Sequence, residues 1–222
     1  MSHFLRFSLA LALVLALPIA GQAATKKKKA AAAPTAASAA AKPADHDYTG
    51  AIVIDAADGK VLFEDGADTT AYPASVTKLM NLLLCLESIE TGKTHLGDQI
   101  AADREDAKMG GTQVYLKEGE VFSMEDYLYA MMIPSANDAA LVLAKHVAGS
   151  REAFVAAMNQ RAAQLGMNRT HFVTPNGLAS PKQEADTSTP RDIATLSREV
   201  VKHALTFKFT ATKERTFRKE PL

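Results

Sequence analysis

The sequence predicts an α+β domain, in which an antiparallel sheet carries an inserted subdomain made entirely of helices. A continuous apolar run at 51–55 predicts a buried strand, and 60–64 predicts its returning partner. The pair Asp58-Gly59 between them is typical of a hairpin turn. A helix predicted over 75–90 is apolar nearly all round, which indicates a position inside the domain. A long block of further helical signals completes the pattern.

The helical block is divided by caps and stops. A serine or threonine that can accept a backbone hydrogen bond precedes most of the segments, and glycine follows two of them. The predicted helices cover 123–132, 138–147, 150–165 and a segment opened by Thr189 and Pro190. Thr, Phe and Lys alternate over residues 206–217, so we expect strand or extended chain there.

The N-terminal part predicts export. Residues 1–23 resemble a secretory signal peptide, because Arg6 precedes an apolar run and small residues lead up to Ala23. Ala, Lys and Pro dominate residues 24–46, which indicates a linker, and the domain is expected over 47–222. The alternative is an uncleaved membrane anchor, but the apolar run is shorter than the roughly 20 residues that span a bilayer. We therefore expect any membrane association to be weak or indirect.

Charge and composition exclude several classes of partner. The chain has 25 basic and 25 acidic residues, and this balance gives no reason to expect a nucleic acid. No metal or other cofactor is expected, because the histidines follow no metal-binding spacing. These isolated histidines are His95, His146, His171 and His203. Cys85 lies in an apolar helical stretch and is expected to be buried.

Ser75 and Lys78 open the predicted buried helix with a spacing of three, which places both side chains on one face. A serine hydroxyl needs an adjacent base to act as a nucleophile, and a lysine can be this base when burial lowers its pKa. Unsatisfied backbone N–H groups at the helix start would favour a developing oxyanion. The structural alternative is a capping serine followed by a lysine in solvent. We expect the reactive pair, because a lysine in the first turn opposes the helix dipole.

A second pair, Ser135 and Asn137, follows Pro134 in a short break between two helical segments. Such a break can aim a hydroxyl and a carboxamide at one point. Ser135 would then relay a proton between Lys78 and a leaving amine. Asn137 would hold a substrate amide and orient Lys78. The structural alternative is that Ser135 or Asn137 is an ordinary helix cap.

Together, Ser75-Val-Thr-Lys78 and Ser135-Ala-Asn137 resemble two of the three signature motifs of the active-site serine penicillin-recognising enzymes. Further segments are similar to the low-molecular-weight D-alanyl-D-alanine carboxypeptidases of serine peptidase family S11. These segments are 73–80, 111–119, 134–139, 172–178 and 188–194, and they follow the order expected for that family. The resemblance implies a β-lactamase/DD-peptidase-like fold.

The resemblance also implies an activity. Ser75 would be acylated by the penultimate D-Ala carbonyl of a peptidoglycan stem peptide, and Lys78 would accept its proton. Ser135 would complete proton transfer, and Asn137 would align the substrate before water releases the shortened peptide. It further implies that β-lactam antibiotics acylate Ser75, that no cofactor takes part, and that the protein works in the periplasm or cell envelope of a bacterium.

The third motif of these enzymes, Lys-Thr-Gly, does not occur in the sequence. Its usual distance from the Ser-x-Asn motif would place it beyond Leu222. We therefore expect a chain that lacks the C-terminal strands and helix of this fold. We also expect that a fluorescent penicillin does not stably acylate it.

Three other functions compete with this hypothesis. A class A β-lactamase needs a glutamate that activates the deacylating water, and Glu152 has no convincing surrounding motif. A DD-endopeptidase uses the same groups, so the sequence leaves it open. A catalytically impaired protein that binds the cell wall is consistent with the missing third motif.

Overall fold

The computed structural model describes residues 48–179 and 184–218. All of them belong to one compact unit, Lys42–Leu222. The predicted signal peptide and linker, 1–23 and 24–46, lie outside the described residues. The elements are β1 (Ala51–Ile54), β2 (Val61–Asp65), the 3-10 helix η1 (Ala74–Thr77), α1 (Lys78–Glu90), β3 (Gln99–Ala101), the 3-10 helix η2 (Asp106–Lys108), β4 (Val121–Ser123), α2 (Met124–Met132), α3 (Asn137–Ala148), α4 (Arg151–Gln164), α5 (Pro190–Val200) and α6 (Thr206–Thr210).

Strands β1 and β2 form the predicted antiparallel hairpin, with Val53 opposite Phe63. The prediction that the first strand is buried was wrong. One face of β1 contacts α5, and this contact buries Ile52 and Ile54 only in part. Val53 is 50% exposed. Successive strand residues point to opposite faces, so an apolar run does not by itself indicate burial on both sides.

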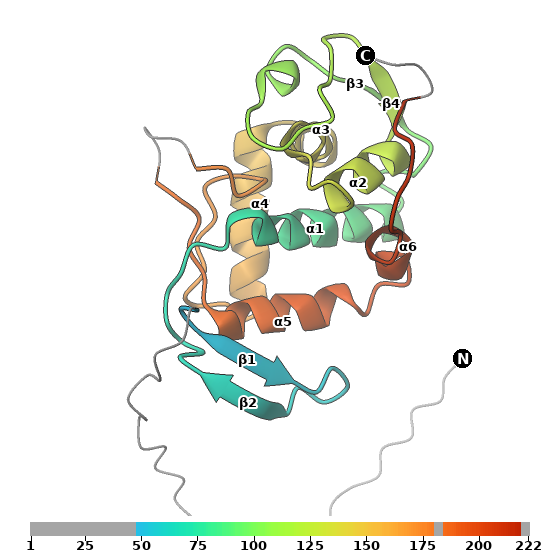
Figure 1. Ribbon diagram of the computed structural model, residues 1–222. Coiled ribbons are helices and arrows are strands. Elements are labelled where there is room, and N and C mark those ends of the chain that lie inside the picture. The colour runs from blue at the N-terminus through green and yellow to red at the C-terminus, as the bar shows by residue number, and fades with distance from the viewer. Residues whose placement is uncertain (1–47, 180–183, 219–222) are drawn as a thin grey trace, which may run out of the picture. The chain divides into compact units, whose positions relative to one another are not determined.

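The long predicted helix is confirmed, but it begins as one turn of 3-10 helix, η1, before it continues as α1. Helix α1 contacts α2, α3, α4 and α5, and Figure 1 shows it crossing the middle of the helical part with α5 and the hairpin below it. This central position explains why its side chains are apolar nearly all round. The glycine predicted to end it, Gly92, has a φ of +69° just past the last turn.

The helical block agrees with the predicted caps. At the start of α2, α4 and α5, the capping side chain accepts a hydrogen bond from the backbone N–H three residues later. The capping residues are Ser123, Ser150 and Thr189. Pro190 occupies the first turn of α5, where a missing N–H removes no hydrogen bond. Gly149 follows α3 in the left-handed conformation.

A second two-stranded sheet, β3 with β4, was not predicted. Ile100 pairs with Phe122 in this antiparallel ladder. Each strand is only three residues long, too short for an alternating pattern to stand out from the surrounding sequence.

The prediction of strand or extended chain over 206–217 was wrong for its first five residues, which form α6. In a strand, Phe207 and Phe209 would point to the same face. In the helix they diverge: Phe209 is fully buried and its ring lies 4.9 Å from that of Tyr129, whereas Phe207 is 60% exposed. Tertiary packing therefore decides the conformation, and the residues from 211 to 218 form no further helix or strand.

The core lies between the helices. Its buried methionines fill space between them, and Cys85 is fully buried, as predicted. The buried methionines are Met80, Met124, Met131, Met158 and Met167. Within residues 48–179 and 184–218, no helix combines the length and the apolar character needed to cross a membrane.

Candidate active site

Ser75 lies in η1, at the start of the central helix, and is exposed to solvent. The residue before it, Ala74, has a φ of +47°, a conformation that residues with a side chain rarely adopt. Such local strain persists only where the surrounding structure enforces it, and it is concentrated at functional sites.

Lys78, the first residue of α1, is only 2% exposed. Its Nζ atom lies 3.0 Å from Ser75 Oγ and donates a second hydrogen bond of 3.0 Å to the backbone carbonyl of Asn176. The structural alternative, a capping serine with a lysine in solvent, is therefore wrong. Burial lowers the pKa of Lys78 to about 8. A neutral amine at this distance can accept the proton of the Ser75 hydroxyl.

The loop 172–178 forms one wall of the site. Its Gly177 has a φ of +83°, and a Cβ atom at this position would lie 1.8 Å from the carbonyl oxygen of Ala74 and 3.0 Å from the backbone nitrogen of Ser75. Only a glycine allows the two backbones to approach so closely. The loop is therefore in direct contact with the peptide that precedes Ser75.

Asp186 holds this loop in place. Its buried carboxylate accepts hydrogen bonds from the backbone N–H of Val173 at 2.6 Å and from the N–H and hydroxyl of Thr174 at 2.9 and 2.6 Å. It also accepts one from the hydroxyl of Thr77 at 3.3 Å, directly before Lys78. One carboxylate thus ties the loop to η1.

Ser135 lies between α2 and α3 and is half-buried, with a φ of +64°. The cap of α3 is Ala136, and no side chain provides a capping hydrogen bond there, so the structural alternative for this pair is wrong as well. Over the described residues, no hydrogen bond joins Ser135 to Ser75 or Lys78.

Asn137 is buried on the opposite wall of the site. Its Nδ2 donates to the carbonyl of Gly110 at 3.0 Å, and its backbone N–H donates to the carbonyl of Thr112 at 2.8 Å. Gly111 lies against it, because a Cβ atom there would be 2.6 Å from Asn137 Nδ2. The segment 110–112 is therefore fitted around the Asn137 side chain.

No hydrogen bond joins Asn137 to Lys78 in the part of the chain that the structure describes. Asn176 lies between them. Its backbone carbonyl accepts from Lys78, and its Nδ2 donates to the backbone carbonyl of Asn137 at 3.4 Å. The two predicted motifs are thus connected through one residue for which the sequence suggested no role.

Behind the site, Asn81 joins α1 to the same loop. Its Nδ2 donates to the carbonyl of Pro175 at 2.9 Å and to that of Ala140 in α3 at 3.0 Å. The thiol of Cys85 donates to Asn81 Oδ1 at 3.4 Å, and burial raises the pKa of this thiol well above its usual value. Nothing in the sequence pointed to Asn81 or Asp186, and Asn176 was included only in the similarity of the loop 172–178 to the S11 enzymes.

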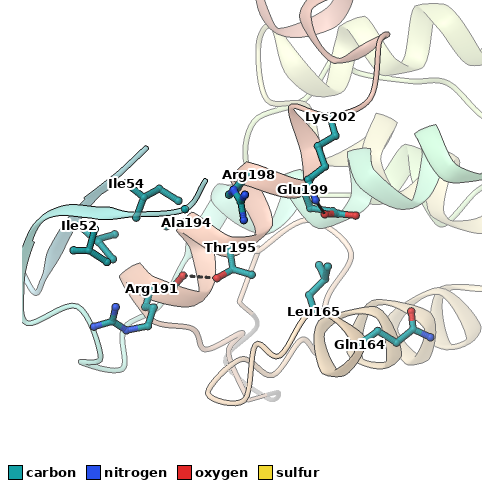
Figure 2. A pocket seen from close by; sticks show the side chains of 12 residues that line it. Ile52, Ile54, Gln164, Leu165, Arg191, Ala194, Thr195, Arg198, Glu199 and Lys202 are labelled. Atoms are coloured by element: carbon teal, nitrogen blue, oxygen red, sulfur yellow. Dashed lines mark hydrogen bonds and ion pairs between the residues drawn. The ribbon is translucent and has the colours of Figure 1, made fainter. Parts of the chain in front are cut away.

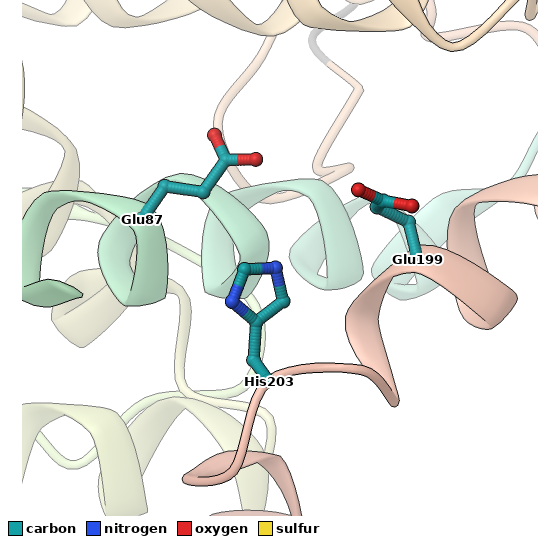
Figure 3. A group of neighbouring side chains, drawn as sticks. All are labelled: Glu87, Glu199 and His203. Carbon is teal, nitrogen blue, oxygen red and sulfur yellow. The ribbon is translucent and has the colours of Figure 1, made fainter.

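One cluster away from Ser75 has the chemistry of metal ligands. Figure 3 shows the neighbouring side chains of Glu87, Glu199 and His203. Each offers one ligand atom, and these atoms lie within 4.8 Å of one another. The two carboxylates already share the guanidinium of Arg161, at 2.7 Å from Glu87 and 3.0 Å from Glu199. Lys202 adds a further cation at 2.6 Å from Glu199. These contacts account for the cluster as an ion-pair network between α1, α4 and α5.

A separate pocket lies between β1 and α5, lined by Ile52, Ile54 and Arg198 among others (Figure 2). The Arg198 guanidinium donates to the carbonyls of Ala56 at 3.0 Å and Ala57 at 2.8 Å. None of the four predicted site residues lines this pocket. It therefore belongs to the hairpin end of the molecule and not to the site around Ser75.

Comparison with known proteins places this chain in a family. The D-alanyl-D-alanine carboxypeptidase family, Peptidase S11, matches residues 35–221. D-alanyl-D-alanine carboxypeptidase DacF of Bacillus subtilis is 36% identical over 169 residues, which cover 76% of this chain and 43% of DacF. A D-alanyl-D-alanine endopeptidase of Escherichia coli is 31% identical over 205 residues, covering 92% of this chain and 61% of the relative.

A solved structure of a penicillin-binding protein is also similar to this chain. Penicillin-Binding Protein D2 of Listeria monocytogenes, in its ampicillin-bound form, has a TM-score of 0.65 and 30% sequence identity, over 74% of this chain and 66% of that one. The α+β fold predicted from the sequence is thereby confirmed. The chain spans less than half the length of DacF. From the family match and these similarities, the chain belongs to the Peptidase S11 family.

Proposed function

We propose that this protein acts as a serine-type D-alanyl-D-alanine carboxypeptidase, with Ser75 as nucleophile and Lys78 as its general base. The observation that carries the proposal is the buried Lys78 amine, 3.0 Å from Ser75 Oγ. A lysine that is 2% exposed and has a pKa of about 8 is a costly structural element but a suitable base near neutral pH.

The proposed substrate is a peptidoglycan stem peptide that ends in D-Ala-D-Ala. Ser75 Oγ attacks the carbonyl of the penultimate D-Ala while its proton passes to Lys78 Nζ. The C–N bond then breaks, the terminal D-Ala leaves with a proton relayed through Ser135, and an acyl-enzyme remains on Ser75. Water hydrolyses this ester and restores the hydroxyl. Asn137 holds the substrate backbone during both steps.

β-Lactam antibiotics are proposed to acylate the same hydroxyl, because a strained β-lactam amide presents a carbonyl where the peptide would. The ampicillin-bound form of the Listeria protein supports this part of the proposal. The proposal includes the organisation predicted from the sequence: a signal peptide over 1–23, a linker over 24–46 and a peptidase domain over 47–222. Such a protein would work in the periplasm or cell envelope of a bacterium.

Peptide mapping by mass spectrometry after prolonged exposure to ampicillin tests the assignment. We expect an adduct on the peptide that carries Ser75, and its loss in Ser75→Ala and Lys78→Met. Prolonged exposure also detects an adduct that forms slowly, so this test does not require stable labelling by a fluorescent penicillin. An adduct elsewhere in the chain, or one that persists in Ser75→Ala, would contradict the proposal.

A second candidate function is hydrolysis of peptide cross-links, as in a DD-endopeptidase. The similarity to the E. coli endopeptidase favours it, because that similarity extends over 92% of this chain. Digestion of cross-linked muropeptides separates the two activities: an endopeptidase releases monomers, whereas a carboxypeptidase releases only D-alanine. Muropeptide binding without release of either product would instead favour the catalytically impaired, wall-binding alternative.

A further inference from the structure

The loop from Gly110 to Leu116, here called the roof loop, contains a strained residue that the mechanism above does not use. Tyr115 has a φ of +57° and is 60% exposed. A bulky residue in the left-handed region is a true outlier, so something in the fold must hold this backbone.

Two side chains of opposite charge hold it. The carboxylate of Asp138 accepts from the backbone N–H groups of Val114 and Leu116, each at 3.2 Å. The guanidinium of Arg218 donates to the backbone carbonyls of Val114 and Tyr115, at 3.0 Å for Tyr115. The peptides on both sides of Tyr115 are therefore fixed by charged partners, which make stronger hydrogen bonds than neutral ones.

Arg218 is itself fixed in place. Its Nε and Nη2 atoms form a two-point contact with Glu120, at 2.7 and 2.6 Å, and its guanidinium lies 5.4 Å from the ring centroid of Phe122. The side chain is only 15% exposed. The planar guanidinium can donate to the Glu120 carboxylate and to both backbone carbonyls at once. The single ammonium group of a lysine cannot reach all three.

The roof loop leads directly to the proposed substrate-binding residue. The carbonyls of Gly110 and Thr112 accept from the side chain and the backbone of Asn137, at 3.0 and 2.8 Å. Asn137 is followed by Asp138, which holds the far half of the loop. If the backbone around Tyr115 becomes more mobile, the carbonyls of Gly110 and Thr112 in the same loop move as well. These two carbonyls hold the side chain and the backbone of Asn137.

We propose that Arg218 is a positioning residue for this site: it fixes the roof loop and, through that loop, the Asn137 amide that receives the substrate. The inference rests on the proposed function for its consequence in catalysis. Its structural part, the fixing of the roof loop, stands independently of that function.

Arg215 provides a matched control. It belongs to the same C-terminal segment, pairs with Asp126 at 2.6 Å and lies 4.1 Å from the ring centroid of Tyr129. Both arginines therefore combine an acid with an aromatic ring, but of the two only Arg218 donates hydrogen bonds to the backbone of the roof loop. Arg218→Lys and Arg215→Lys keep the charge and remove the planar guanidinium.

The first measurement is amide hydrogen exchange of peptides covering 110–116. We expect exchange to accelerate about tenfold in Arg218→Lys, as loss of a charged hydrogen bond predicts, and to stay unchanged in Arg215→Lys. Equal exchange of the roof loop in the two variants would overturn the proposal, as would acceleration spread over all helices. If Arg218→Lys does not fold, Glu120→Gln, which weakens the contact with Arg218, must show the same acceleration within residues 110–116. The Glu120 carboxylate also accepts from the backbone N–H of Lys117 at 2.8 Å, so faster exchange confined to residue 117 does not count as support.

The second measurement is acylation of Ser75 by ampicillin in the same variants. We expect Arg218→Lys to lower the second-order rate about tenfold, through weaker initial binding and not through a slower chemical step. Equal rates in Arg218→Lys and Arg215→Lys would remove the catalytic half of the inference. If the unmodified protein is not acylated at all, the proposed function fails, and hydrogen exchange alone decides whether Arg218 positions the roof loop.

Discussion

Each wall of the site combines a closely packed glycine with a carboxylate that holds a loop, but the two walls differ in which of these contacts is tighter. On the wall that carries Ser75, the backbone of Gly177 lies directly against the peptide before the nucleophile. On the wall that carries Asn137, charged side chains hold the roof loop by hydrogen bonds. Closely packed backbones leave no room for added atoms, whereas the hydrogen bonds of charged side chains can be weakened one at a time. Substitutions on the first wall should therefore act mainly on global stability, and those on the second wall mainly on local mobility, with smaller effects on stability.

The largest effect is expected for Gly177→Ala. The new methyl group would overlap the carbonyl of Ala74 at 1.8 Å, and the strained φ adds to this cost. We expect a loss of about 4 kcal/mol or more in the free energy of unfolding, measured with urea. Gly119→Ala is the matched control, because Gly119 has the same φ of +83° with nothing within 4 Å. It should cost about 1–2 kcal/mol, and equal losses would show that packing at Gly177 is not decisive.

Burial of Lys78 makes stability depend on pH. Its pKa is about 8 in the folded protein and 10.5 ordinarily, so the unfolded chain binds more protons between these values. The penalty is complete below pH 8 and disappears above pH 10.5. Stability should thus rise with pH in this window, by about 3 kcal/mol in total, relative to Lys78→Met. Urea unfolding at several pH values measures the difference, and parallel curves for the two proteins would contradict it.

Replacement of Asp186 should have a smaller effect. Asp186→Asn keeps the shape of the side chain but places an NH2 group where one oxygen accepted hydrogen bonds from Val173 or Thr174. We expect a loss of about 2 kcal/mol in the free energy of unfolding. Asp192→Asn is the control, because Asp192 is also buried and accepts from the backbone of Arg169 at 3.0 Å, away from the site. Both should lower stability, but only Asp186→Asn should shift the pH profile of Ser75 acylation, because Asp186 holds Thr77 and the loop that contacts Lys78. Identical profiles would show that these ties do not position Lys78.

The smallest effect concerns the strain on the other wall. Tyr115→Gly and Tyr115→Ala both remove the exposed ring, but only glycine relaxes a φ of +57°. The glycine variant should be more stable than the alanine variant by about 1 kcal/mol, as thermal unfolding would show. A difference of the opposite sign would mean that the hydrogen bonds around Tyr115 do not hold a strained backbone.

The same comparison explains what the sequence could predict. Ser75 and Lys78 were predictable because a spacing of three fixes their relation on any helix, whatever surrounds it. Asn137 was found through its motif. Asn176 acts through its backbone carbonyl, which every residue possesses, and Gly177 acts by the absence of a side chain. Such roles depend on which segments cross in space and leave no signature in side-chain chemistry.

The errors in the fold have a related cause. Local pattern predicted the caps of α2, α4 and α5, because a cap and its partner are three residues apart. It failed at α6, where burial of Phe209 against Tyr129 overrides an alternating sequence. It also overstated the burial of β1, because the pattern of a strand does not reveal how many of its faces are covered.

The buried thiol of Cys85 makes the opening of the site's rear wall measurable. It is the only cysteine in the 222 residues, and it is hydrogen-bonded to Asn81, which also holds the loop 172–178 through Pro175. An alkylating reagent can reach this sulfur only when α1 and its neighbours separate. The rate of alkylation therefore measures how often the packing behind Ser75 opens, and the unmodified sequence suffices for the experiment.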